Sequence, residues 1–125
     1  MIDLIPPANA FKFEVQTPKP GKFLVHLQGR LLDKTNGMKL YDNLILALNN
    51  EKKPQVLLNL QNLEYLNSEG LNTLIRCLSL SRKKGGDLWI TQANQSLNSL
   101  FLSTRLSDLF LTIDSPQTWI ELPQD

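Results

Sequence analysis

Residues 55–78 read QVLLNLQNLEYLNSEGLNTLIRCL, and this stretch decides the fold class. Its opening run, QVLLNL at 55–60, is short and apolar and follows Pro54, which is typical of a central strand covered on both faces. Residues 61–67 are predicted to form a loop. A helix follows, with apolar side chains spaced i, i+3, i+4, i+7: Leu71, Leu74, Ile75 and Leu78. A strand that leads into a helix is the repeating unit of an α/β protein.

Regular elements are predicted on both sides of this stretch. Residues 11–16 and 22–28 alternate apolar with polar side chains around a Pro-Gly turn and predict a hairpin-like strand pair. The other predicted elements are a helix before the stretch and alternating strands and helices after it: 38–48, 88–91, 96–102, 109–113 and 116–122. We therefore expect an α/β fold with a mixed, mostly parallel β-sheet of about five strands and about four helices packed mainly on one face.

The length of the chain fits one domain. At roughly 100–200 residues per domain, 125 residues leave no room for a second one. We expect an N-terminal arm at 1–10, the domain at 11–122 and a C-terminal tail at 123–125. Leucine is the unusual residue, because the chain has 26 Leu beside 7 Ile and 3 Val. That density of apolar side chains excludes a disordered protein.

Charge and cysteine usage exclude several classes of protein. A formal net charge of +1 gives no electrostatic case for a nucleic-acid partner or an anionic membrane. Cys77 is the only cysteine and His26 the only histidine, which excludes an internal disulfide and a structural zinc site. No apolar run approaches the roughly 18 residues of a membrane span, and Met1–Pro7 lacks the basic residues of a secretion signal. We expect a soluble, cytoplasmic protein without a cofactor or metal.

No combination of residues predicts an enzyme. Cys77 lies on the apolar side of a predicted helix and is interpreted as a small buried side chain. His26 alternates with apolar strand residues, and nothing in the sequence offers it a nucleophile and an orienting acid. The basic run Arg82-Lys83-Lys84 suits the end of a helix, with phosphate binding as the weaker alternative. Trp89 and Trp119 are interpreted as core or sheet-covering aromatics.

The polar cluster Asn67-Ser68-Glu69-Gly70 separates the predicted loop from the helix and admits two interpretations. The first is a helix N-cap, because Asn and Ser are favoured there and an acidic residue suits the first turn. The second is a regulatory site. A serine hydroxyl at a helix start is exposed and open to modification, and a phosphate there would meet free backbone N–H groups and the positive end of the helix dipole.

Three landmarks in order make the chain resemble a STAS domain of the bacterial anti-sigma-factor antagonist type. Residues 29–35 (GRLLDKT) resemble the family's G-x-L-D-x-x-T after the second strand. Residues 57–71 resemble the family's strand and the D-S-[ST]-G-L that follows it, and residues 82–88 resemble the basic, glycine-ended close of the next helix. The resemblance covers about residues 11–122, and it rests on the order and spacing of the motifs together.

The resemblance implies a non-enzymatic partner switch. It identifies Ser68 as the residue phosphorylated by a partner anti-sigma factor that is also a serine kinase. The unphosphorylated antagonist binds that partner, the phosphorylated form lets go, and a phosphatase resets the switch. The residues expected to contact the partner surround Ser68 or flank the first motif: Leu32, Asp33, Thr35, Leu66, Asn67, Glu69 and Gly70. No direct nucleic-acid or membrane contact is implied, and we expect a monomer or weak dimer.

The sequence departs from the family pattern in four places. Asn67 stands where the family usually has Asp, and Glu69 stands where it has Ser or Thr. Leu32 occupies the position of the first motif's Asp, with Asp33 one residue later, and Arg105 replaces a common glycine at the end of the third helix. The changes beside Ser68 favour an alternative function: a STAS scaffold or ligand-sensing module that binds protein partners without phosphorylation.

Some leucines do not fit the predicted core faces. The four that remain are Leu32, Leu46, Leu66 and Leu102. Two of them flank the motif loops, so we hypothesise that the set contributes to an apolar docking surface around Ser68.

Overall fold

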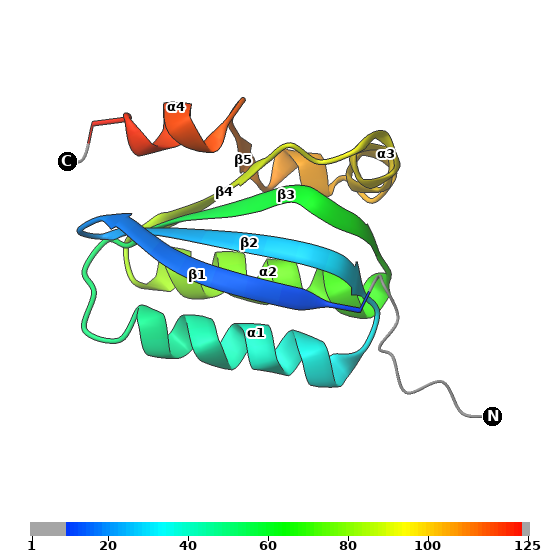
Figure 1. Ribbon diagram of the computed structural model, residues 1–125, viewed down its shortest axis with the longest axis horizontal. Helices are drawn as coiled ribbons and strands as arrows, with labels where there is room; N and C mark the ends of the chain where they lie inside the picture. Colours follow the sequence, from blue (N-terminus) through cyan, green and yellow to red (C-terminus); the bar gives the residue numbers. More distant parts are fainter. Residues whose placement is uncertain (1–9, 124–125) are drawn as a thin grey trace.

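The computed structural model describes residues 10–123 and places one long strand at the centre of a five-stranded sheet (Figure 1). The strand order is β1-β2-β3-β4-β5. The strands run from β1 (Lys12–Lys19) and β2 (Lys22–Leu31) through β3 (Gln55–Leu66) to β4 (Asp87–Thr91) and β5 (Leu111–Thr112). β1 and β2 pair antiparallel and the other pairs are parallel. The predicted mixed, mostly parallel α/β sheet is confirmed.

Two long helices cover one face of the sheet. They are α1 (Lys34–Ala47) and α2 (Ser68–Lys83), which lie side by side below the sheet in Figure 1. α3 (Gln95–Ser103) adds apolar side chains to the same core, followed by the short 3-10 helix η1 (Leu106–Asp108). α4 (Pro116–Ile120) lies on the opposite face, where Trp119 packs with two strand leucines in a small second core.

The main core explains most of the leucine content. Leucines from β2, β3, α1 and α2 point into the layer between the sheet and the helices, and many have no exposed surface. Full burial of one such side chain stabilises the fold by about 1.5–3 kcal/mol. This leucine-rich layer is therefore the main source of stability of the fold.

Among residues 10–123, no helix is long and apolar enough to cross a bilayer.

Several predicted boundaries were wrong. Residues 61–67 are not a loop, because β3 continues to Leu66 and pairs there with Leu31 of β2. Leu63 and Leu66 enter the core while the polar residues between them face solvent, so the segment keeps its place in the sheet. α1 starts at Lys34 rather than at 38, because Asp33 caps a polar first turn. The last strand is only two residues long, Leu111–Thr112.

The ends of the chain lie largely outside the described residues. Residues 1–9 of the expected arm and residues 124–125 of the expected tail are not described.

Candidate functional site

Two helix N-termini meet at the carboxyl ends of β2 and β3. The strands are parallel and each leads into a helix, so α1 and α2 begin side by side (Figure 1). The Asn67 side chain joins the two junctions, because its Nδ2 donates to the carbonyl of Leu32 at 2.8 Å. The backbone N–H of Asn67 also donates to Leu31 O at 3.4 Å. The first STAS-like motif and the serine motif, more than thirty residues apart in sequence, thus form one surface.

Ser68 is the first residue of α2 and its side chain is exposed. Asn67 is the N-cap, and its Oδ1 accepts from the N–H of Gly70 at 3.1 Å. The Ser68 hydroxyl has no hydrogen-bond partner among residues 10–123, and the N–H groups of Ser68 and Glu69 belong to the unpaired first turn. The N-cap interpretation of the cluster is confirmed for Asn67, and this cap leaves the neighbouring Ser68 hydroxyl free among the described residues.

Asp33 caps α1 beside this serine. Its Oδ2 accepts from Asn36 N at 3.0 Å and its Oδ1 accepts from Asn36 Nδ2 at 2.8 Å. These hydrogen bonds hold the pKa of the Asp33 carboxyl below its ordinary value. Thr35 and Leu32 are exposed on either side of the cap, and Leu32 has 40% of its surface accessible. The rim of the site therefore consists of the hydrogen-bonded carboxylate of Asp33, the hydroxyl of Thr35 and the exposed side chain of Leu32.

Two residues expected to contact a partner are buried. Leu66 has no accessible surface, so the expectation that it lines a docking surface was wrong. Gly70 is also buried, and a Cβ there would lie 2.6 Å from Leu66 Cβ and would press on the carbonyl of Leu31. The close approach of α2 to the ends of β2 and β3 thus requires the glycine.

A groove between α1 and α2 begins at Glu69, the residue after Ser68, and the sequence did not predict it. It has a volume of about 370 Å³, and its lining includes Lys34, Met38, Asn72 and Arg76. The Arg76 guanidinium lies over the ring of Tyr41 at 4.6 Å from the centroid, which joins the two helices. The available signal was periodicity: Asn72 and Arg76 follow Ser68 at i+4 and i+8 and so share its helix face.

The other unassigned leucines lie apart from this surface or on other elements. Leu46 is 73% exposed near the end of α1, about 18 Å along the helix from its start. Leu102 is 68% exposed near the end of α3. Of the four, only Leu32 combines exposure with a position beside Ser68, so the predicted leucine surface around the serine does not form as a set.

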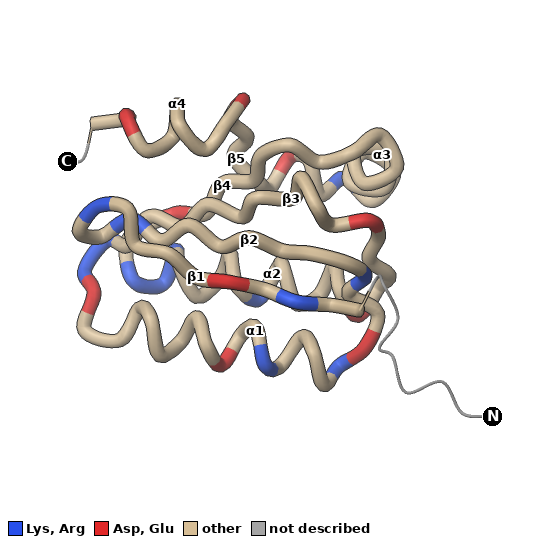
Figure 2. Tube along the Cα trace, in the orientation of Figure 1, with Lys and Arg blue, Asp and Glu red and all other residues tan. Residues whose placement is uncertain are grey.

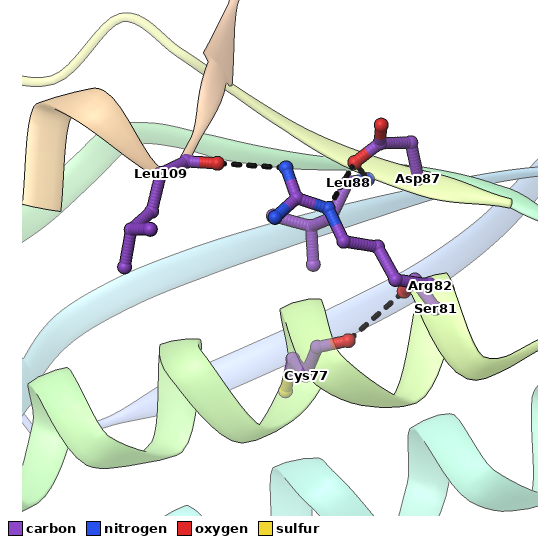
Figure 3. A network of polar contacts seen from close by, with 6 residues as sticks. All are labelled: Cys77, Ser81, Arg82, Asp87, Leu88 and Leu109. Atoms are coloured by element: carbon purple, nitrogen blue, oxygen red, sulfur yellow. Dashed lines mark hydrogen bonds and ion pairs between the residues drawn. The ribbon is translucent and has the colours of Figure 1, made fainter.

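Cys77 is a buried side chain, and Arg82 of the basic run lies at the end of α2, as the sequence predicted. Cys77 is buried and desolvation raises the pKa of its thiol to about 12, which leaves it unreactive. Ser81 Oγ donates to the carbonyl of Cys77 at 2.9 Å (Figure 3). Arg82 extends from the last turn of α2 to Asp87 Oδ1 at 3.1 Å and to the carbonyl of Leu109 at 2.8 Å. Arg82 therefore fastens the helix end to β4 and to the chain before β5.

His26 lies on the open part of the other sheet face. Its Nε2 is 3.0 Å from Gln16 Oε1, and its Nδ1 is 3.1 Å from Asn59 Nδ2. Both ring nitrogens therefore have amide partners, with no acid or nucleophile among them. Within the described chain, no group of three or more His, Cys, Asp or Glu could hold a metal ion.

Comparison with known proteins gives a family match and several structural neighbours. The family model described as the STAS domain matches residues 14–118. The anti-sigma factor antagonist SpoIIAA in its unphosphorylated form superposes with a TM-score of 0.75 at 13% identity, covering 88% of this chain and 94% of that chain. The Bacillus SpoIIAA in its phosphorylated form gives 0.70 at 12% identity, over 88% and 97% of the two chains.

One neighbour belongs to a different kind of protein. The murine anion transporter Slc26a9 gives a TM-score of 0.58 at 13% identity, over 66% of this chain and 14% of that chain. At these identities each likeness shows the fold alone. The same fold therefore occurs both as a small antagonist and within a much larger transporter.

Proposed function

This chain belongs to the STAS domain family, as its motifs predicted, and we propose that it is a partner-switching regulator of the anti-sigma-factor antagonist type. In this function it is non-enzymatic and acts in the cytoplasm. It binds an anti-sigma factor that is also a serine kinase while Ser68 is unphosphorylated, and it releases that partner once Ser68 carries a phosphate. A phosphatase restores the binding form.

The observation that carries this proposal is the position of the Ser68 hydroxyl. It is exposed, it has no hydrogen-bond partner among residues 10–123, and it begins α2 one residue before Glu69, which lines the groove between α1 and α2. A kinase can reach such a hydroxyl without unfolding the chain. The SpoIIAA structures in unphosphorylated and phosphorylated forms show that a protein of this fold exists in both states.

A phosphate at this position changes the charge of the whole surface. It adds about −1.5 to −2 charge at neutral pH beside Glu69 and near Asp33, both of which are exposed carboxylates. A partner that fits the neutral hydroxyl must then accommodate a bulky anion. A loss of only about 2.7 kcal/mol in binding free energy lowers affinity about a hundredfold, which is sufficient for release.

A second candidate function is a STAS scaffold or ligand-sensing module without phosphorylation. Glu69 favours it, because a permanent carboxylate next to Ser68 disfavours the addition of a second negative charge. Asn67 does not count against the switch, since it caps α2 as an Asp would. The two candidates differ only in whether the charge at position 68 controls partner binding.

The test is a pull-down from the native lysate with Ser68→Ala and Ser68→Asp, analysed by mass spectrometry. We expect Ser68→Ala to retain the partner and Ser68→Asp to lose it, at least tenfold in recovered amount. The matched control is Asn43→Asp, which adds the same charge on the exposed side of α1. Equal recovery with both Ser68 variants would contradict the switch and support the scaffold. A wild-type protein that gains one phosphate from the recovered kinase and ATP, when Ser68→Ala gains none, would identify the acceptor.

A further inference from the structure

A pocket of about 600 Å³ lies at the opposite end of the molecule from Ser68. Three segments far apart in sequence form it: the β1–β2 turn, the segment between α1 and β3, and the end of α4 (Figure 1). We call it the lysine pocket, because Lys22, Lys52 and Lys53 line it together with Trp89 and Trp119. Its volume lies within the range of small-molecule sites, which is about 300–1,000 Å³.

The lysine pocket is strongly cationic. Among the described residues, its lining contains three lysines and no acidic side chain. Figure 2 shows further Lys and Arg positions gathered at this end, in the β1–β2 turn and at the end of α2. Three described acids lie close to the lining residues in sequence, and none of them lines the pocket. Asp87 pairs with Arg82, Glu121 accepts from Gln117 Nε2 at 2.8 Å, and Glu51 is half-buried. The chain has a formal net charge of only +1, but three of its lysines line this one pocket.

Lys22 supplies a charge that is fixed in position. It is only 2% exposed, and its Nζ donates to the carbonyls of Trp119, Ile120 and Leu122 at 2.6, 3.1 and 2.9 Å. Its ammonium also lies over the Trp119 ring, 5.0 Å from the centroid. All three protons of the ammonium have acceptors, so Lys22 contributes its field to the pocket while Lys52 and Lys53 keep free donors.

Lys53 is held in an unfavourable backbone conformation. Its φ of 57° lies in the left-handed region, where a side chain other than Gly costs about 1 kcal/mol or more. Its N–H donates to the carbonyl of Lys84 at 3.0 Å, which fixes the segment against the end of α2. Neither Lys52 nor Lys53 has an ion pair among residues 10–123. Glycine would adopt this conformation at a lower cost, and the residue present is a lysine that lines the pocket.

Two tryptophans line the pocket together with the lysines. Trp89 and Trp119 pack edge to face with centroids 6.4 Å apart. Trp119 is buried, whereas Trp89 is half-exposed toward the pocket. The pocket thus combines two free ammonium groups with an accessible ring, which suits a ligand that has an anionic end and an apolar body.

We propose that the lysine pocket binds a phosphate monoester, with the phosphate at Lys52 and Lys53 and the organic part against Trp89. The lining suits a doubly charged anion, because the exposed Lys52 and Lys53 line the same pocket as the fixed charge of Lys22. The same chemistry occurs in free phosphorylated small molecules and in the headgroup of phosphatidic acid. The proposal is independent of the function proposed for Ser68.

The test uses the full chain and three probes: methyl phosphate, phenyl phosphate, and phosphatidylcholine vesicles with or without phosphatidic acid. Binding is measured by calorimetry, with Trp fluorescence as a local reporter because both tryptophans of the chain line the pocket. We expect saturable binding that weakens with salt, and phenyl phosphate to bind about fivefold more tightly than methyl phosphate. Preference for the soluble esters or for the phosphatidic acid vesicles identifies the source of the ligand.

The decisive variant is Lys53→Gly, matched with Asn50→Gly. Both residues have a positive φ in the same segment, but only Lys53 lines the pocket. We expect both variants to be more stable than the wild type, and only Lys53→Gly to lose affinity, by about tenfold. If no probe gives saturable binding, or if Lys53→Gly binds as tightly as Asn50→Gly, the proposal is wrong.

Discussion

The two ends of the sheet are built by different means. At the Ser68 end, Asp33 and Asn67 cap their own helices through hydrogen bonds to residues three positions on, and Asn67 adds one long-range bond to the Leu32 carbonyl. At the lysine-pocket end, Lys22 is held by carbonyls 97 to 100 residues away. The first end leaves a hydroxyl free and the second leaves ammonium groups free. Substitutions should therefore affect the first end through local capping and packing, and the second through long-range contacts.

The largest effect is expected from Gly70→Ala at the Ser68 end. A Cβ there would lie 2.6 Å from Leu66 Cβ and would press on the carbonyl of Leu31, so strand and helix must separate. We expect a loss of about 3 kcal/mol in the free energy of unfolding, measured by urea denaturation. Asn72→Ala, exposed on the same helix, should change it by less than about 0.5 kcal/mol. A mild effect of Gly70→Ala would mean that α2 is less tightly packed against β2 and β3 than described.

Lys22→Met tests the other end. The variant keeps an apolar stem but removes the ammonium from three carbonyls at the end of α4. We expect a loss of about 2 kcal/mol by thermal denaturation, together with a change in Trp119 fluorescence. Lys52→Met, which alters an exposed lysine in the same pocket, should leave stability nearly unchanged. Equal effects of the two substitutions would show that the long-range contacts of Lys22 do not hold α4.

Arg105→Gly lies outside both ends and should stabilise the chain. Arg105 has a φ of 62°, in the left-handed region, at the position where the family pattern commonly has glycine. Glycine adopts this conformation without strain, so we expect a gain of about 1 kcal/mol. Thr104→Gly, whose φ is −94°, provides the control and should not stabilise. The melting temperatures of the two variants should therefore move in opposite directions, and a shared direction would contradict the strain.

The smallest effect is expected from Asp33→Asn, and it depends on pH. Asn also caps helices, so the two proteins should differ by only about 0.5 kcal/mol at neutral pH, from the charge of Asp near the helix dipole. Because folding lowers the Asp33 pKa, its stabilising contribution is present above the ordinary pKa of about 4. This contribution is lost as the pH falls through the lower pKa that Asp33 has in the folded protein. Denaturation at several pH values should show that the wild type loses stability relative to Asp33→Asn in acid. A stability difference between the two proteins that does not change with pH would contradict the prediction.

Local signals predicted the Ser68 end well. The apolar spacing located α2, and the preference of Asn for the N-cap agreed with the observed bond to Gly70. The end of β3 was missed because Gln61, Asn62 and Glu64 look like a loop, although the strand carries them on its solvent side. The start of α1 was missed for a related reason, since its first turn is polar and only the Asp33 cap indicates it.

The burial of Leu66 and Gly70 could not be predicted in the same way. Both residues belong to a motif that looks like an exposed switch loop, and only the pairing of β3 with β2 shows that they face inward. The lysine pocket was equally hidden, because Trp119 and Lys22 come together only when α4 crosses the second face of the sheet.

The sequence by itself determined the order of the elements, the cap of α2, the STAS family and the exposed serine. These depend on periodicity and on hydrogen bonds between residues a few positions apart, which act before the chain is assembled. Only the tertiary structure decided which motif residues remain at the surface, that the two helix starts share one groove, and that three lysines line one pocket. Those properties depend on strand order and on contacts between distant segments, and no local pattern encodes them.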